Sequence, residues 1–469
     1  MRLHAIGPLG AGVAAAAPTT KQHKLSVTDV SVIGTQENLF PYLGGSAPYF
    51  SYPITYGVQS EIPEQCTLQQ IQLLARHGER YPTKNIGSKI LDTYHKLCNF
   101  SSDFEGSLSF LNRNYEFFLP EAKNFEELTT WDNTLDPINP YTGEWGAQKH
   151  AREFLNQYRE LLENKTSFPI FTSNSKRVYD TAKIFAEALG DKFNVSLQII
   201  DEDPVSGANT LTPNKSCTVY NVTENIDVHS KFPDQYLSNI ARRLNVPNNG
   251  LDLTRADAEN LFFWCAYEIN VKGYSNMCNV FTPEELAYFS YSDDMISYYH
   301  HGPGNRLGPV VGSVSFNASL ELLRQHESLD VKAWLSFTHD SNIINYLSSI
   351  GILNPTHALP ADYIQFTNHV YHKSWMAPQG ARIYTQLYHC SDNFYVRYVI
   401  NDAVIPIESC SNGPGLSCEL EDFIEFAQAR MNGSDYITAC DIASSSNHKY
   451  LTFFWDYESK HYNASLIHK

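Results

Sequence analysis

A short apolar segment that leads directly into a cluster of charged side chains constrains this chain more than any other feature. Residues 68–75 are mostly apolar with partial alternation, which predicts a buried β-strand. One imidazole, two guanidinium groups and a carboxylate follow within seven residues, in the order Arg76, His77, Gly78, Glu79, Arg80 and Pro82. Proline cannot donate a ladder hydrogen bond, so the strand should end here. The sequence therefore predicts a concentrated positive charge at the end of a strand.

The residue types in this cluster favour the chemistry of an anion. Guanidinium groups present forked donors that match phosphate or carboxylate oxygens. An imidazole between two such cations should have a lowered pKa, and a neutral imidazole is a usable nucleophile at acid pH. Gly78 allows the backbone to turn sharply or to approach a ligand closely. We therefore interpret His77 as a candidate nucleophile between two anion-binding arginines, Arg76 and Arg80.

A second strand and helix bring another arginine to a ligand-binding position. Residues 169–172 predict a short strand, and the stripe that follows predicts a helix that is capped by one of residues 173–175 and stopped at Gly190. Arg177 would then lie in the first helical turn after a strand, where α/β folds bind ligands. Because a cation there opposes the helix dipole, Arg177 needs an anionic partner, and a ligand role and a solvated arginine both stay open until the family pattern described below favours the ligand role.

A third strand ends in a histidine and an aspartate. Residues 334–338 predict a buried strand, His339 and Asp340 follow it, and a helix that stops at Gly351 comes next. A pair at the join of a strand and a helix N-terminus again has the ligand-binding geometry of α/β folds. Alone, such a dipeptide is more often a cap and a packed histidine. Together with the first cluster it indicates one composite site.

Composition limits the possible partners. The chain of 469 residues has a net charge of −17, which argues against nucleic acid as a partner. No run approaches the roughly 18 apolar residues of a spanning helix, so we expect no membrane partner. The same negative charge would repel an anionic substrate, so a locally basic pocket must overcome the overall field.

Cysteines and glycosylation sequons predict an extracellular location. Nine cysteines are spread over the chain without a C-x-x-C pair, so at least one is unpaired or bonded to another chain. N-x-S/T sequons occur at Asn99, Asn164, Asn194, Asn214, Asn221, Asn317, Asn432 and Asn463. This density predicts a secreted glycoprotein. We interpret residues 1–24 as a signal, pro- or cloning-derived segment and leave open which.

The remaining patterns predict an α/β lobe with a central mixed, mainly parallel sheet flanked by helices, and a smaller, mostly α-helical inserted lobe. Helical spacing occurs in residues 86–99, 104–118, 146–162, 236–244, 254–270, 282–300, 307–325 and 419–431. Strands are predicted at 193–200, in a hairpin over 381–400 and in the aromatic segment 451–457. The predicted domain division is an extended arm, 25–65; an α/β domain, 66–98 with 168–216 and 302–469; and a helical lobe, 99–167 with 217–301.

These motifs together resemble a known family. R-H-G-x-R-x-P, the pattern S-x-R-V-x-x-T-A around Arg177, and the His-Asp pair resemble the histidine acid phosphatases, a branch of the phosphoglycerate-mutase-like superfamily. Segments such as NPYTGE, SGANTL, FFWCAYEIN and RYVINDAVIPIE extend the likeness to the yeast acid phosphatases and phytases over about residues 30 to 465. The resemblance implies an acid phosphomonoesterase that acts without a metal or another cofactor.

The resemblance also implies a role for each site residue. His77 would attack phosphorus and form a phosphohistidine, and Asp340 would protonate the leaving alkoxide, which a carboxylic acid of modestly raised pKa would do near about pH 4 to 5. The phosphoryl oxygens would be bound by Arg76, Arg80, Arg177 and His339. Positive charge on these oxygens is what phosphoryl transfer chiefly needs.

Further expectations follow from the same likeness. The implied disulfides are Cys66–Cys390, Cys217–Cys440, Cys265–Cys278 and Cys410–Cys418, with Cys98 free. Glu79 either forms a structural salt bridge or lowers the affinity for a highly charged substrate, and Thr83 and Lys84 are expected to help line the pocket. Phytate and smaller phosphomonoesters therefore both stay open as preferred substrates. A homo-oligomer, a dimer or tetramer, is expected as well.

Other functions lack their motifs. The chain contains no G-x-x-x-x-G-K-[ST], G-x-S-x-G or H-E-x-x-H. The pair His300–His301 lacks companion ligands at metal-binding spacing, so a solvated helix end is the better interpretation. A phosphoglycerate mutase or bisphosphatase would share the R-H-G core but would be cytosolic. A non-catalytic secreted glycoprotein of this fold would have lost at least one site residue, and none is missing.

Overall fold

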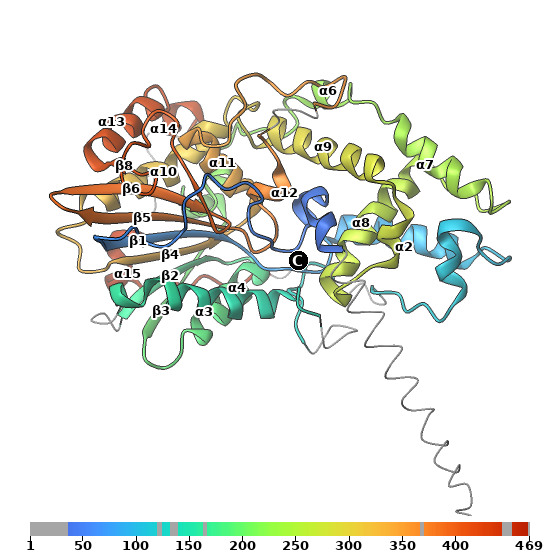
Figure 1. Ribbon diagram of the computed structural model, residues 1–469, viewed down its shortest axis with the longest axis horizontal. Helices are drawn as coiled ribbons and strands as arrows, with labels where there is room; N and C mark the ends of the chain where they lie inside the picture. Colours follow the sequence, from blue (N-terminus) through green and yellow to red (C-terminus); the bar gives the residue numbers. More distant parts are fainter. Residues whose placement is uncertain are drawn as a thin grey trace, which may run out of the picture.

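A single mixed β-sheet forms the centre of the larger lobe (Figure 1). The computed structural model describes residues 36–119, 124–131, 139–162, 167–365, 370–442 and 453–467. The strands are β1 (Cys66–Arg76), β2 (Ser167–Ser173), β3 (Asn194–Ile200), β4 (Ala333–Thr338), β5 (Arg382–Cys390), β6 (Asn393–Ile400), β7 (Ala403–Ile405) and β8 (Cys418–Glu419). Their order is β3-β2-β4-β1-β5-β6-β7, and β8 pairs with β6. The first four strands in this order are parallel, and β5 begins an antiparallel part.

The parallel register brings the predicted site segments to one edge of the sheet. Arg76 pairs with Thr338, and the His77 backbone N–H donates to the Thr338 carbonyl at 3.1 Å. Thr172 in turn pairs with Phe337. Because β1, β2 and β4 are parallel neighbours, the residues that follow them meet at their shared carboxyl ends.

Helices cover both faces of this sheet (Figure 1). One face packs against α3 (Gly143–Leu162) and α4 (Lys176–Ala188), whose apolar side chains share a core with the inner residues of β1, β2 and β4. The other face packs against α10 (Gly308–Arg324), α11 (Asp340–Ile350) and α13 (Leu420–Met431). The result is a three-layer α/β/α lobe with a mixed sheet flanked by helices, as the sequence predicted, but the sheet is not mainly parallel, because β5, β6, β7 and β8 all pair antiparallel with their neighbours.

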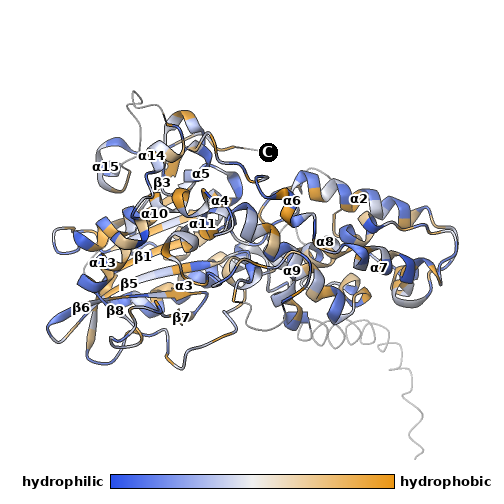
Figure 2. Cartoon of the chain, turned by 90° about the horizontal axis from the view of Figure 1, so that it is seen from above, coloured by the Kyte–Doolittle hydropathy of each residue, from blue (hydrophilic) through white to orange (hydrophobic). Residues whose placement is uncertain are grey.

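A smaller helical lobe lies beside the edge of the sheet at which the parallel strands end, as Figure 2 shows from above. It contains α2 (Lys84–Cys98), α7 (Gln235–Asn245), α8 (Arg255–Lys272) and the first half of α9 (Pro283–His300). A capping box begins α9, with the side chains of Thr282 and Glu285 bonded to each other's backbone. Trp264 on α8 is fully buried at the centre of this lobe.

Two helices pack in a different lobe from the one that the sequence predicted. Ile90 and Leu97 of α2 belong to the core of the helical lobe, whereas Ala151 and Phe154 of α3 belong to the core beneath the sheet. We therefore propose a domain division that places α2 in the helical lobe and α3 in the α/β lobe.

Three segments differ from their predicted conformation. Residues 453–460 form helix α15, not a strand, and Phe453, Phe454 and Tyr457 pack on Phe171 of β2. A short aromatic run fits either period, and here tertiary packing selects the helix. Of the helix expected at 104–118, only the 3-10 helix η4 (Gly106–Asn112) forms. The arm is not purely extended, because it contains η2 (Glu37–Tyr42) and η3 (Gly44–Ser46).

The other predicted helices and strands are present within a few residues of their expected bounds. The short elements that connect them are α5 (Pro213–Ser216), α6 (Ile226–His229), α12 (Lys373–Met376), α14 (Tyr436–Ala439), η6 (Pro204–Ser206) and η7 (Asn276–Val280). Among the described residues, no helix is both long and apolar enough to cross a membrane.

The four implied disulfides are formed, and Cys98 is free and exposed. Cys66–Cys390 joins the start of β1 to the end of β5. Six sequon asparagines are exposed, namely Asn99, Asn194, Asn221, Asn317, Asn432 and Asn463. Asn214 is half-buried, and Asn164 lies outside the described residues.

Candidate active site

Arg76 lies at the end of β1 and is almost completely buried. Its Nη1 donates to the carbonyls of Gly45 and Ala377, each at 2.7 Å, and its Nη2 lies 3.5 Å from Asp340 Oδ2. Its Nε is buried and has no hydrogen-bond partner among the described residues. Backbone carbonyls of the arm and of the residue after Met376 therefore fix the Arg76 guanidinium, while one of its donors remains unused.

His77 is buried between cations, and its ring orientation follows from one hydrogen bond. Nδ1 lies 2.9 Å from the Gly78 carbonyl, and a carbonyl oxygen only accepts, so Nδ1 carries the hydrogen and Nε2 has the free lone pair. Burial lowers the pKa of His77 well below its ordinary value, and Arg76, Arg177 and Arg80 lower it further. The predicted direction of this pKa shift is confirmed, with burial as its largest cause.

The guanidinium groups of Arg80 and Arg177 each have one hydrogen-bond or ion-pair partner among the described residues, and each keeps its Nε donor unused. Arg80 Nη1 donates to the Tyr81 carbonyl at 2.8 Å, and its guanidinium lies 5.7 Å from the Tyr267 ring centroid. Nε of each arginine is buried without a partner among the described residues. Because an unpaired buried donor is costly, these donors indicate a site for an acceptor-rich ligand.

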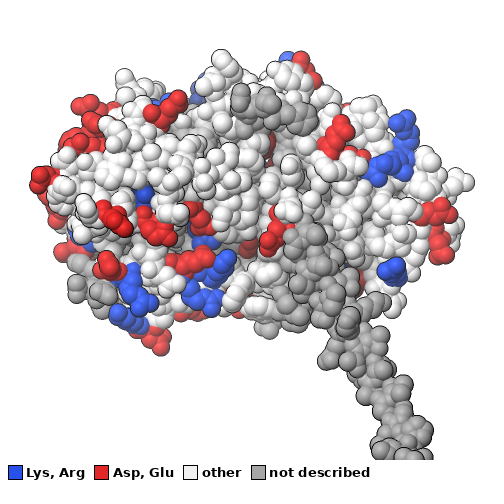
Figure 3. Space-filling view, viewed as in Figure 1, with Lys and Arg blue, Asp and Glu red and all other residues white. Residues whose placement is uncertain are grey.

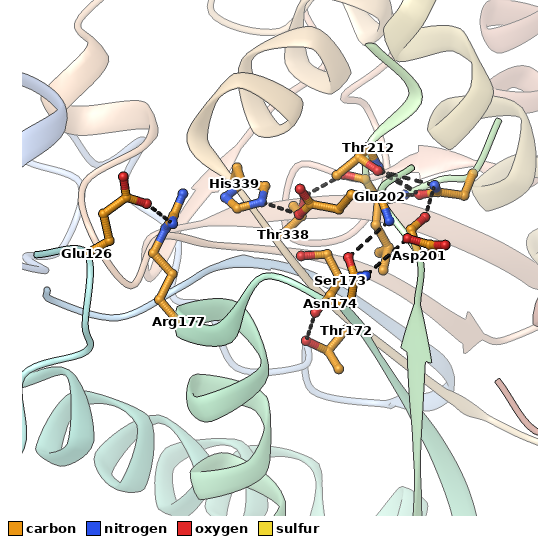
Figure 4. A network of polar contacts seen from close by, with 12 residues as sticks. Glu126, Thr172, Ser173, Asn174, Arg177, Asp201, Glu202, Thr212, Thr338 and His339 are labelled. Atoms are coloured by element: carbon orange, nitrogen blue, oxygen red, sulfur yellow. Dashed lines mark hydrogen bonds and ion pairs between the residues drawn. The ribbon is translucent and has the colours of Figure 1, made fainter. Parts of the chain in front are cut away.

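Arg177 already has an anionic partner, as its place in the first turn of α4 predicted. Its Nη1 lies 2.8 Å from Glu126 Oε2, a contact that Figure 4 shows. Burial lowers the pKa of Arg177 to about 10, so the guanidinium stays charged at acid and neutral pH. Glu126 was not predicted, because it lies in a loop without local signals.

His339 is the N-cap residue of α11, and its ring centroid lies 5.9 Å from that of His77. His339 Nε2 lies 2.5 Å from Glu202 Oε1, beyond the end of β3 (Figure 4). Burial alone would raise the pKa of Glu202, but the charge and hydrogen bond of His339 lower it to about 2. Glu202 thus stays ionised and orients the imidazole. Its position after a parallel strand was the one signal that sequence reasoning missed.

Asp340 lies at the first position of α11, and its side chain is 30% exposed. Its Oδ2 lies 3.5 Å from Arg76 Nη2 and 3.7 Å from Lys373 Nζ. Burial would raise the pKa of Asp340, but these two cations, followed by His301 and His77, hold it well below its ordinary value. The expectation of a modestly raised pKa is therefore wrong for the ligand-free site, because two adjacent cations outweigh burial.

Of these groups, Arg76, Arg80 and Asp340 line a cavity of about 210 Å³ between the two lobes. Its charged lining comes from Arg76, Arg80, Asp340, Lys373, Asp293 and Glu259. Its opposite wall is aromatic and comes from the helical lobe, through Tyr236, Phe262, Phe263, Tyr267 and Phe289. The cavity can therefore take a small anionic group at the arginines and an organic group against the aromatic wall.

The three predicted pocket residues lie away from this cavity. Glu79 is buried, accepts from the Tyr49 backbone N–H at 2.8 Å and lines a separate cavity of about 440 Å³. Burial raises its pKa to about 7, and it forms no salt bridge with a described residue. Thr83 caps α2 by accepting from the Ile86 N–H, and Lys84 is exposed.

The histidine pair at the end of α9 is half-buried, not solvated as predicted. His301 Nδ1 lies 3.1 Å from Tyr220 Oη, and burial lowers the pKa of His301 to about 4. Within the described part of the chain, no cluster of three or more His, Cys, Asp or Glu side chains is arranged to bind a metal.

A three-layer fold with arginines and histidines at the carboxyl ends of its parallel strands defines a class of phosphate-transferring hydrolases. The model of the histidine phosphatase superfamily (branch 2) matches residues 67–401, and this chain belongs to that family. The protein is a phosphoric monoester hydrolase of the histidine acid phosphatase type, and its substrates are small phosphate esters.

Relatives of this chain are similar over nearly their whole length. A probable acid phosphatase of Saccharomyces cerevisiae is 52% identical, covering 95% of each chain. A phytase of Candida albicans is 44% identical, covering 92% of this chain and 93% of that one. The crystal structure of the phytase from D. castellii matches with a TM-score of 0.87 at 44% identity, covering 92% of this chain and 93% of that one.

Proposed function

We propose that the protein hydrolyses phosphate monoesters through a covalent phosphohistidine on His77. The observation that carries this proposal is the buried His77 imidazole, with a free Nε2 lone pair, among three arginines that have unused Nε donors. Nε2 attacks phosphorus, and Arg76, Arg80, Arg177 and His339 neutralise the charge on the phosphoryl oxygens.

In this proposal Asp340 acts in both halves of the reaction. Its carboxyl protonates the leaving oxygen and afterwards takes a proton from the water that hydrolyses the phosphohistidine. In the ligand-free site the carboxyl is ionised, beside Arg76 and Lys373. A bound phosphoryl group brings negative charge that opposes these cations, which raises the pKa of Asp340 and allows it to carry a proton.

The substrates that we propose include phytate, because two relatives with 44% identity are named phytases. A second candidate is a broad acid phosphatase with little phytate activity. The lining of the cavity favours this alternative, since Asp293, Glu259 and an aromatic wall are poorly suited to a ligand with many phosphates. On the face shown in Figure 3, the described Lys and Arg side chains lie among Asp and Glu side chains and form no continuous basic patch.

We propose further that the protein is secreted and glycosylated, and that it forms a dimer or tetramer. Four disulfides support an oxidising location, and six exposed sequons are sterically available for glycosylation.

The nucleophile is tested with p-nitrophenyl phosphate between pH 3 and 7, with EDTA present. We expect the parent protein to be active and His77→Ala to lose at least about 10³-fold in kcat, the usual scale for a missing nucleophile. In samples denatured by an alkaline quench, in which a phosphohistidine is stable, radiolabelled phosphate from the substrate should be bound covalently to the parent and absent from His77→Ala. Equal activity of parent and variant would remove His77 as the nucleophile.

The choice between the two substrate classes needs a direct comparison. The ratio of kcat/KM for phytate to that for a small alkyl monoester, measured at the optimal pH, separates them. A ratio near or above unity supports a phytase, and a ratio far below unity supports the broad acid phosphatase.

A further inference from the structure

Three segments that are distant in the sequence enclose the Asp340 carboxyl. They are η3 of the arm with Gly45, α9 with Asp293, and α12 with Lys373. Lys373 Nζ lies 3.7 Å from Asp340 Oδ2 and 3.3 Å from Asp293 Oδ1. The lysine thus bridges two carboxylates, one of which lies beside the arginines of the site.

The arm closes this arrangement into a ring. Gly45 N–H donates to Asp293 Oδ2 at 2.8 Å, while the Gly45 carbonyl accepts from Arg76 Nη1 at 2.7 Å. Arg76 returns to Asp340 at 3.5 Å. Starting from Gly45, the ring therefore runs through Asp293, Lys373, Asp340 and Arg76 back to Gly45.

The ring is close-packed at Gly45. A Cβ atom at this position would lie 2.7 Å from Lys373 Cε, 3.0 Å from Lys373 Nζ and 3.4 Å from Asp340 Oδ2. A side chain there would displace the lysine, so the arm backbone and the ammonium fit each other closely. Lys373 is also mostly buried, with a side chain that is 15% exposed.

We propose that Lys373 is a positioning residue for Asp340, and that the ammonium, held by Asp293, fixes both the orientation and the charge of this carboxyl. The inference rests on the proposed function, in which Asp340 protonates the leaving group. Nothing in the phosphate-binding role of the three arginines requires a lysine at this position, or a second carboxylate behind it.

Removal of the Lys373 charge and removal of the Asp293 charge should shift the pKa of Asp340 in opposite directions. Removal of the Lys373 charge leaves Asp340 with fewer cations, so its pKa rises and it stays protonated to higher pH. Removal of the Asp293 charge leaves the lysine with a single carboxylate, so the pKa of Asp340 falls. Among the described residues, the charged and titratable groups that act on Asp340 are Arg76, His77, Arg177, His301, His339 and Lys373, with Asp293 on the other side of the lysine.

The test is the alkaline limb of the kcat–pH profile with glycerol 2-phosphate, an alkyl ester whose leaving group needs a proton. Lys373→Met should move the limb upward by about one pH unit, the scale for an opposite charge within about 4 Å. Asp293→Asn, which can still accept from Gly45 N–H, should move it downward. Lys373→Arg should have its alkaline limb at the same pH as the parent protein.

Two comparisons separate positioning from a structural role. With p-nitrophenyl phosphate, whose leaving group needs little help from an acid, kcat of Lys373→Met should fall less than with the alkyl ester. Lys89→Met, at an exposed lysine of α2, should leave both profiles unchanged. Far- and near-UV circular dichroism would check that each variant is folded.

The outcomes are distinct. Limbs that coincide with the parent in both variants, or that move in the same direction, would overturn the role of Lys373. If Lys373→Met does not fold, the Asp293→Asn variant alone tests the proposal. A downward shift of its alkaline limb supports the role of Lys373, and an unshifted limb overturns it. A parent protein without phosphatase activity would instead reject the proposed function.

Discussion

The carboxyl group of Glu79 is buried in the wall of the separate cavity of about 440 Å³, which Arg76 also lines, and burial raises its pKa to about 7. One oxygen accepts from the Tyr49 N–H, and the other has no partner among the described residues. An ionised carboxylate is costly in such a place. A neutral Glu79 therefore suits an enzyme that works in acid, and it explains why a glutamate within the site motif need not repel an anion.

This burial predicts a stability that falls as the pH rises. The folded pKa of about 7 exceeds the ordinary value of 4.5, so the stabilising contribution is complete below about pH 4.5 and is lost as the pH rises through 7. Between pH 4 and 8 the parent should lose about 3 kcal/mol of unfolding free energy that Glu79→Gln does not lose. Urea denaturation at both pH values measures the difference.

A matched control for this prediction is Glu160→Gln, at an exposed position of α3. It should change with pH as the parent does. A Glu79→Gln protein whose stability follows the parent at both pH values would show that Glu79 is ionised in the folded state, contrary to the raised pKa.

At the scale of elements, the packing of α10 on α11 determines where Asp340 lies. The two helices meet closely at Gly312, where an added Cβ would lie 1.9 Å from the Asn345 carbonyl oxygen. Helix α11 begins at Asp340, so a displaced α11 also displaces the carboxyl. The fold thus couples the core of the α/β lobe to the geometry of the site.

Gly312→Ala should therefore lower both stability and activity. We expect a loss of about 1–3 kcal/mol in unfolding free energy, the usual cost of overpacking, and a lower kcat for alkyl monoesters. Urea denaturation and a kinetic assay measure the two effects. Asn317→Ala, at an exposed position of the same helix, should change neither when the unglycosylated protein is used. A stable and fully active Gly312→Ala protein would contradict this account of the α10–α11 contact.

For the whole molecule, the disulfides differ in how much chain they enclose. Cys217–Cys440 links residues 223 positions apart, whereas Cys410–Cys418 links residues only 8 apart. In the chain-entropy account a longer loop stabilises more, because the unlinked unfolded chain gains more freedom.

We predict that the two serine double variants are destabilised unequally. Cys217→Ser with Cys440→Ser should lose about 2–3 kcal/mol more than Cys410→Ser with Cys418→Ser. Denaturation of the three proteins under the same conditions gives the comparison. Equal losses would show that local packing at each bridge, and not the length of the closed loop, governs the effect.

Much of the site could be predicted because its members follow recognisable strands. Arg76 and His77 end one apolar strand, His339 and Asp340 end another, and Arg177 begins the helix after a third. The ends of parallel strands meet at one edge of a sheet, so local patterns were sufficient to bring these residues together. The same reasoning failed for residues 453–460, where the choice between helix and strand depends on contacts with Phe171 and Trp334.

The sequence by itself determined the chemistry at the sheet edge, because charge, strand and helix signals there are local. Only the tertiary structure decided which groups surround that chemistry. Glu126, Asp293, Lys373 and the arm glycine Gly45 come from segments without a local signal of their own, and Glu202 follows a strand without a motif that marks it. Their positions depend on contacts between residues far apart in the chain, and these contacts set the charge state of Asp340.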